Sequence, residues 1–238
     1  MGPYNSPLPL AKEFWSSMAW VICGYIVFSV LLFQFASAIW PVIFDTSSDA
    51  RNENYFWAVS WVAVVSAALL LFAVTEWSNW IGAGYFAGRL RGERGWFLIA
   101  IFVSPVIWIG ISILMNTIMG GGSDWVYANE ESAAYAANAQ ITLASVFYVV
   151  LLAPLWEELV YRGVGMGAML ARGWHPFLAV GVISALFAGI HLQYSPAAVF
   201  IVFVGGIWFG ILRLVSGSVG VAIAAHVSIN ATLTLLQA

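Results

Sequence analysis

About seven stretches of this chain are long and apolar enough to cross a lipid bilayer. A transmembrane helix needs about 20 largely apolar residues to span a hydrocarbon core of roughly 30 Å. The candidate spans lie near residues 16–40, 55–76, 95–119, 139–160, 176–193, 196–214 and 219–237. A transmembrane β-barrel would need short strands that alternate apolar and polar residues, and the sequence has no such alternation. The spans predict an all-α fold: a polytopic transmembrane helical bundle with about seven spans.

The composition excludes ordinary soluble domains and nucleic-acid-binding proteins. Of the 238 residues, 62% are hydrophobic and 8% are charged, far from the composition of a soluble globular domain. The net charge is only -3, and one short basic run at 89–94 offers no surface for a nucleic acid. We therefore expect the chain to be embedded in the lipid bilayer and to have no nucleic-acid partner.

The basic residues predict how the spans cross the membrane. Cytoplasmic loops are enriched in lysine and arginine. If the seven spans alternate, most of the basic residues fall on one side: Lys12, Arg89, Arg91, Arg94, Arg172 and Arg213. Arg51 is the exception in the opposite loops. This pattern predicts a multi-pass protein of a cell inner membrane with its N-terminus in the cytoplasm.

Five ionisable residues remain inside the predicted spans or within two residues of one: Glu157, Glu158, Arg162, His191 and His226. Ionisable side chains are costly in a bilayer, so each is a functional hypothesis. Glu158 and Arg162 are four residues apart with the acid first, the favourable order for a helical ion pair, and they can equally well be structural. Glu157 is rotated by about 100° along the helix and cannot share their face. It is therefore the candidate base.

Two of the three histidines lie in predicted spans. Each has an aromatic or amide side chain one helical turn away, on the same face of the helix. His191 follows Phe187 by one helical turn in "SALFAGIHL", and His226 precedes Asn230 by one turn in "AAHVSIN". A single buried histidine is more often a satisfied core group. Together with Glu157, however, these polar side chains in a very apolar region indicate one common site.

Simple hairpin geometry permits these groups to meet. If the chain reverses at residues 173–174, Glu157 and His191 each lie 17 residues from the turn and therefore at the same depth. His226 follows the next turn, near Gly217, and is expected to lie closer to that turn. The arithmetic allows a single site near the middle of the bilayer.

A carboxylate, two imidazoles and a carboxamide around one point can activate water and stabilise an oxyanion. Glu157 would accept a proton from water and His191 would orient that water. His226 and Asn230 would then donate hydrogen bonds to the tetrahedral oxygen of an acyl-transfer reaction.

Three other interpretations are open. Glu157, His191 and His226 could bind zinc, although the ligands would come from three helices and the HExxH pattern is absent. His191 and His226 could ligate haem, which would leave Glu157 and Asn230 unexplained. The chain could also be a membrane scaffold without enzymatic activity.

Three short motifs occur in this part of the chain: "EELVYR" has the form EExxxR, "FAGIH" the form FxxxH and "HVSIN" the form HxxxN. In form and order they resemble the motifs of the CPBP family, the CAAX protease and bacteriocin-processing intramembrane endopeptidases, and in particular its type II CAAX prenyl endopeptidases. The resemblance covers about residues 139–238, which would form a catalytic core of about four spans. Residues 1–138 would form an N-terminal transmembrane region of about three spans.

The resemblance implies an intramembrane endopeptidase that hydrolyses a peptide bond with a glutamate-activated water. It assigns catalytic roles to Glu157, His191, His226 and Asn230, and supporting roles to Glu158 and Arg162. A peptide or membrane-protein substrate is expected, and no cofactor. The alternatives are a zinc-dependent protease with Glu157, His191 and His226 as ligands, or a catalytically silent membrane scaffold or immunity protein. The predicted topology places Glu157 toward the outer half of the membrane, which favours a substrate reached from the membrane or from outside.

Overall fold

The computed structural model describes residues 89–120 and 143–237, together with isolated positions between 19 and 76. Apart from those positions, the first two predicted spans lie outside the described residues, as does nearly all of the loop predicted at 120–138. Within the described part, the elements are all helices, and one isolated β-bridge pairs Arg89 with Ser218. The predicted all-α class is confirmed for this part of the chain.

The third predicted span is a single helical run from residue 94 to 118. It consists of α4 (Arg94–Leu98), the π-helix η3 (Ile99–Val103) and α5 (Ser104–Ile118). In a π-helix each backbone N–H bonds to the carbonyl five residues earlier, instead of four. The predicted span at 95–119 is confirmed within two residues.

The fourth predicted span is a longer helix than expected. Residues 143–171 form one continuous run of five segments: α7 (Leu143–Phe147), η4 (Tyr148–Leu152), α8 (Ala153–Glu158), η5 (Leu159–Gly165) and α9 (Met166–Ala171). The prediction ended this span at residue 160, just before Arg162. The helix continues because Arg162 is neutralised by Glu158 one turn earlier, so the apolar residues that follow stay buried.

The last three helices are α10 (Pro176–Gly189), α11 (Pro196–Ser216) and α12 (Val219–Gln237). The chain reverses before α10 at Gly173 and before α12 at Gly217, with φ of 81° and 64°, backbone angles that favour glycine. Both predicted turns are confirmed. At the start of α11, the Ser195 hydroxyl accepts a hydrogen bond from the Ala198 N–H at 3.2 Å, as a helix N-cap does.

Helix α10 ends at Gly189, earlier than the predicted residue 193. In an α-helix, the N–H of His191 would bond to the carbonyl of Phe187. Here that carbonyl accepts a hydrogen bond from the His191 side chain at 2.9 Å, and the His191 N–H bonds to Ala188 instead. This side-chain competition turns the chain at His191.

Three described helices are long and apolar enough to cross a membrane: Arg94–Ile118, Pro196–Ser216 and Val219–Leu236. Helix α10 is also apolar but shorter. These helices are typical of an integral membrane protein. The total of about seven spans stays a prediction, because the first two lie outside the described residues.

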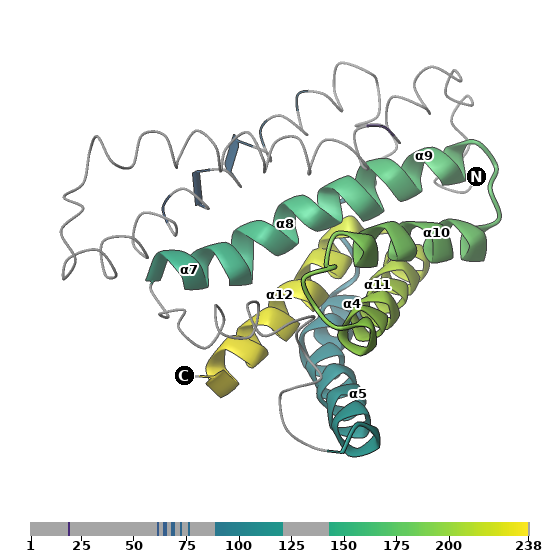
Figure 1. Cartoon of the computed structure of the whole chain (residues 1–238). Helices are drawn as coiled ribbons and strands as arrows, with labels where there is room; N and C mark the ends of the chain where they lie inside the picture. Colours follow the sequence, from purple (N-terminus) through teal and green to yellow (C-terminus); the bar gives the residue numbers. More distant parts are fainter. Residues whose placement is uncertain are drawn as a thin grey trace.

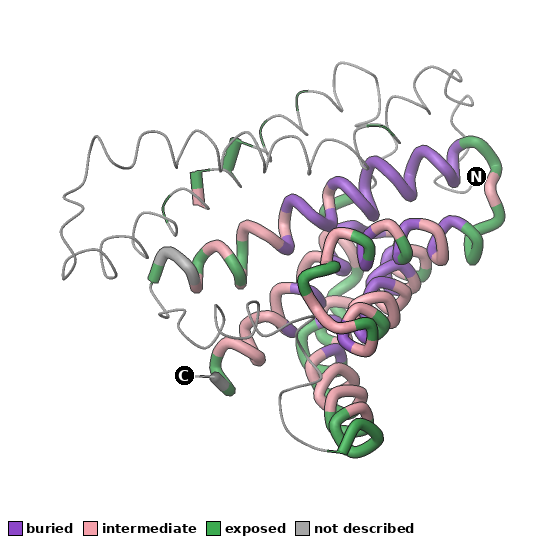
Figure 2. The backbone as a smooth tube through the Cα atoms, viewed as in Figure 1, coloured by how far each residue is buried: buried purple, intermediate pink, exposed green. Residues whose placement is uncertain are grey.

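The helices pack around α12. Figure 1 shows helix 143–171 running along one side of α10, α11 and α12, while the run from α4 to α5 packs against α11 and α12. Apart from the half-buried Leu159, helix 143–171 is buried from Glu157 through α9. Figure 2 shows that its other end, at α7, is more exposed. The carboxylates of this helix are therefore held inside the bundle.

Glycines allow α10 and α11 to approach closely. A Cβ added at Gly206 would lie 3.1 Å from the Cβ of Ser184, and one at Gly210 would lie 2.8 Å from a methyl group of Val180. Small residues at these two positions therefore let the helices pack closely.

Candidate active site

Polar side chains from α8, α12 and the turn after α10 border one cavity of about 410 Å³. They include Glu157, His191, His226 and Asn230, the four catalytic candidates, together with Gln193 and Thr234. The rest of the lining includes aromatic side chains such as Trp108, Tyr148 and Phe209. The cavity thus combines a polar cluster with aromatic and aliphatic side chains.

Glu158 and Arg162 form a fully buried ion pair. An Nη1–H of Arg162 donates to Oε1 of Glu158 at 3.0 Å, and neither side chain is exposed. Arg162 also donates from Nη2 to the Gly206 carbonyl in α11 at 2.9 Å. Its guanidinium carbon lies 4.5 Å from the ring centroid of Phe187 and 5.3 Å from that of Phe209. The predicted pair is confirmed, and it joins helix 143–171 to α11.

His226 links both glutamates. Its Nδ1 lies 3.0 Å from Oε1 of Glu158, the oxygen that also accepts from Arg162. Its Nε2 lies 3.8 Å from Oε2 of Glu157. A carboxylate oxygen is an acceptor, so Nδ1 carries a proton in the contact with Glu158.

The Nδ1 of His191 faces a backbone carbonyl, whereas the Nδ1 of His226 faces a carboxylate. Its Nδ1–H donates to the carbonyl of Phe187 at 2.9 Å, since a carbonyl can only accept. In a neutral ring Nε2 is then an acceptor. The side chain borders the cavity, and its ring lies 4.9 Å from the ring of Phe187. Nε2 is therefore the atom of His191 that can accept a hydrogen bond from water.

Asn230 is held by the backbone of helix 143–171. Its Nδ2 donates to the carbonyl of Val149 in η4 at 2.9 Å. Since that partner is an acceptor, the amide nitrogen must face it, and this fixes which way the amide is turned.

The geometry also separates the two adjacent glutamates. Glu157 borders the cavity, whereas Glu158 is completely buried against Arg162 and His226. The prediction that they face different surroundings is confirmed. The contact between Glu158 and His226 was missed, because the two residues are 68 positions apart and no local pattern pairs them. The position of Trp108, from the third span, in the lining of the cavity was missed for the same reason.

The residues proposed as zinc ligands can be tested for fit. Among the described residues, no three His, Cys, Asp or Glu side chains are grouped closely enough to hold a metal ion. Because Nδ1 of His226 donates to Glu158, the nitrogen of this ring open to a metal would be Nε2, which lies 3.8 Å from Oε2 of Glu157. The zinc alternative stays a prediction.

Comparison with known proteins gives one match. Residues 138–232 match the family model described as type II CAAX prenyl endopeptidase Rce1-like. This segment contains all three motifs and every candidate site residue. No curated protein and no solved structure matches the chain.

Proposed function

We propose, from the match of residues 138–232 to the Rce1-like model of type II CAAX prenyl endopeptidases, that this protein is an intramembrane endopeptidase that activates water with Glu157. The family is a protease family, and the apolar helices support a membrane location. One observation carries the proposal: Glu157, His191, His226 and Asn230 border a single cavity.

The reaction would begin with a water molecule between Glu157 and His191. Nε2 of His191 accepts a hydrogen bond from this water, and the carboxylate of Glu157 takes its proton. The oxygen attacks the carbonyl carbon of the scissile peptide bond, forming a C–O bond. Glu157 then gives the proton to the leaving amine as the C–N bond breaks. The carboxylate is regenerated, and one water is consumed for each bond cleaved.

The negative charge on the tetrahedral oxygen would be stabilised by Asn230 and His226. Asn230 has a second Nδ2–H besides the one bonded to Val149. His226 can donate from Nε2 only when the ring carries both protons, because Nδ1–H already donates to Glu158. A positive His226 would also balance the cluster, in which two glutamates face a single arginine. We therefore assign Glu158 a supporting role: it holds His226 as an oxyanion donor.

The substrate would be a peptide or a membrane protein that enters from the bilayer. The apolar and aromatic lining of the cavity suits a hydrophobic segment. With the N-terminus in the cytoplasm of an inner-membrane protein, as the basic residues predict, the site would lie toward the outer half of the membrane. The chemistry proposed here needs no cofactor.

Comparative proteomics of membrane fractions tests this function. Cells that express wild-type protein, Glu157→Ala or Glu93→Ala would be compared, because Glu93 is an exposed glutamate at the start of α4 and serves as the matched control. A precursor should accumulate with Glu157→Ala alone. Identical profiles in all three strains, with equal amounts of inserted protein, would contradict a protease and favour a silent scaffold or immunity protein.

A further inference from the structure

Pro154 lies just after the π-helix η4, where the backbone N–H of residue 154 would continue the hydrogen-bond pattern of that helix. The N–H of Ala153 bonds to the carbonyl of Tyr148, five residues earlier. In the same pattern the next N–H, at residue 154, would bond to the carbonyl of Val149. Proline has no N–H, so this carbonyl lacks its backbone donor. Nδ2 of Asn230 donates to it instead, at 2.9 Å.

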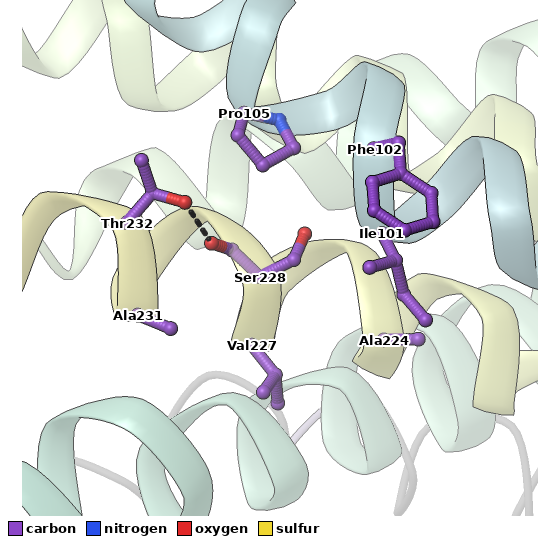
Figure 3. A pocket seen from close by; sticks show the side chains of 8 residues that line it. All are labelled: Ile101, Phe102, Pro105, Ala224, Val227, Ser228, Ala231 and Thr232. Atoms are coloured by element: carbon purple, nitrogen blue, oxygen red, sulfur yellow. Dashed lines mark hydrogen bonds between the residues drawn. The ribbon is translucent and has the colours of Figure 1, made fainter.

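The same arrangement occurs a second time, on the other side of α12. The π-helix η3 is followed by Pro105, also the second residue of the next α-helix. The carbonyl five residues before Pro105 belongs to Ala100. The hydroxyl of Ser228 in α12 lies 3.0 Å from this carbonyl and 2.8 Å from the carbonyl of Ala225, so its one proton is shared. Figure 3 shows Pro105 and Ser228 across an apolar groove between the two helices.

Helix α12 is therefore held on two sides by carbonyls that lack a backbone donor because of proline. Ser228 and Asn230 are two residues apart, which corresponds to a rotation of about 200° around the helix. One contact lies on the face toward η3 and the other on the face toward η4. Only Asn230 borders the cavity that contains Glu157. In both contacts a side chain of α12 donates to a carbonyl five residues before a proline, but only the contact of Asn230 lies at the candidate active site.

We propose that Pro154 is a positioning residue for peptide hydrolysis, acting through Asn230. Because it has no N–H, it leaves the Val149 carbonyl to bind one amide proton of Asn230 and so directs the second toward the cavity. Pro154 is buried and need not touch the substrate. This inference rests on the proposed function, since it assigns Asn230 to the oxyanion.

The kinetic test replaces Pro154 by a residue with an N–H. In Pro154→Ala the new N–H competes with Asn230 for the Val149 carbonyl. With a quenched fluorogenic peptide spanning the cleavage site of the accumulated precursor, we expect kcat to fall about 10-fold to 100-fold. KM should change less than about twofold, since substrate binding is not altered. In an Asn230→Ala background the same substitution should slow cleavage no further.

Two controls separate positioning from folding. Pro105→Ala makes the same change at η3 and should leave kcat at the wild-type value. The ester formed by an α-hydroxy acid analogue of alanine at position 154 has neither the N–H nor the ring. It should recover most of the kcat lost in Pro154→Ala. Equal losses of kcat in Pro154→Ala and Pro105→Ala, or no recovery with the ester, would overturn the inference.

A readout without activity keeps the inference independent of the proposed function. In protein labelled with ¹⁵N-asparagine, the Asn230 amide resonances would be assigned by their loss in Asn230→Asp. They should shift in Pro154→Ala and stay in place in Pro105→Ala. Unmoved resonances in Pro154→Ala overturn the inference. If they shift while the wild-type protein cleaves nothing, the contact stands and the proposed function alone fails.

Discussion

Nδ1 of His226 lies 3.0 Å from Oε1 of Glu158, the same oxygen that accepts a hydrogen bond from Arg162. A buried ion pair that only joined helices would not need to touch a residue of the cavity. Here the pair ends on the imidazole whose other nitrogen lies 3.8 Å from Glu157. The ion pair is thus connected through His226 to the proposed base, and the following predictions separate a structural role of the pair from the proposed chemical one.

Removing the charge of Glu158 should destabilise the bundle. In Glu158→Gln, Arg162 keeps a buried charge without its counter-ion, and we expect a loss of roughly 3–5 kcal/mol in unfolding free energy. The double variant Glu158→Gln with Arg162→Met removes both charges and should lose less than the single variant. Unfolding by SDS in mixed micelles, followed by circular dichroism, measures both. A single variant as stable as the wild type would contradict the burial of this pair.

Gly206→Ala should destabilise the contact between α10 and α11. The added Cβ would lie 3.0 Å from Nη2 of Arg162 and 3.1 Å from Cβ of Ser184, and overpacking of this kind costs about 1–3 kcal/mol. Gly181→Ala is the matched control, because a Cβ there meets no atom within 4 Å. Gly181 lies inside α10, where alanine should stabilise by about 0.5–1 kcal/mol. Thermal unfolding in detergent measures both melting temperatures. A shift in the same direction in the two variants would contradict the packing argument.

His191→Asn should distinguish the structural role of Nδ1 from the proposed catalytic role of Nε2. The asparagine amide can still donate to the Phe187 carbonyl, as Nδ1 does, but it has no counterpart of Nε2. We expect the melting temperature to be retained while the cleavage rate falls about 10²-fold to 10⁴-fold, because the water is no longer oriented for proton transfer to Glu157. His175→Asn, in the exposed turn before α10, should cleave normally. Full activity in His191→Asn would exclude Nε2 from the reaction.

Much of the fold could be predicted because it depends on short stretches of sequence. Apolar length indicated the helices at 94–118, 196–216 and 219–237, and glycines indicated the turns at Gly173 and Gly217. The pair of Glu158 and Arg162 followed from helical spacing alone. Each of these features is decided by residues within a few turns of one another.

The remaining features depend on contacts between distant segments. The π-helix η4 pairs its Val149 carbonyl with Asn230, and residue spacing alone cannot indicate a partner 81 positions away. The early end of α10 depends on the ring of His191 turning back to Phe187. The motifs indicated four residues that border one cavity, but only the packing of α12 against helix 143–171 indicates which atoms meet.

We propose that Glu157, and no metal, activates the water. The most direct measurement is the rate at which purified protein in liposomes cleaves the accumulated precursor after chelation, with zinc content determined by elemental analysis. We predict that metal-depleted wild-type protein cleaves at its original rate, while Glu157→Gln, equally well folded, does not cleave. Activity that disappears with about one zinc per chain and returns with added zinc, or near-normal cleavage by Glu157→Gln, would contradict the account.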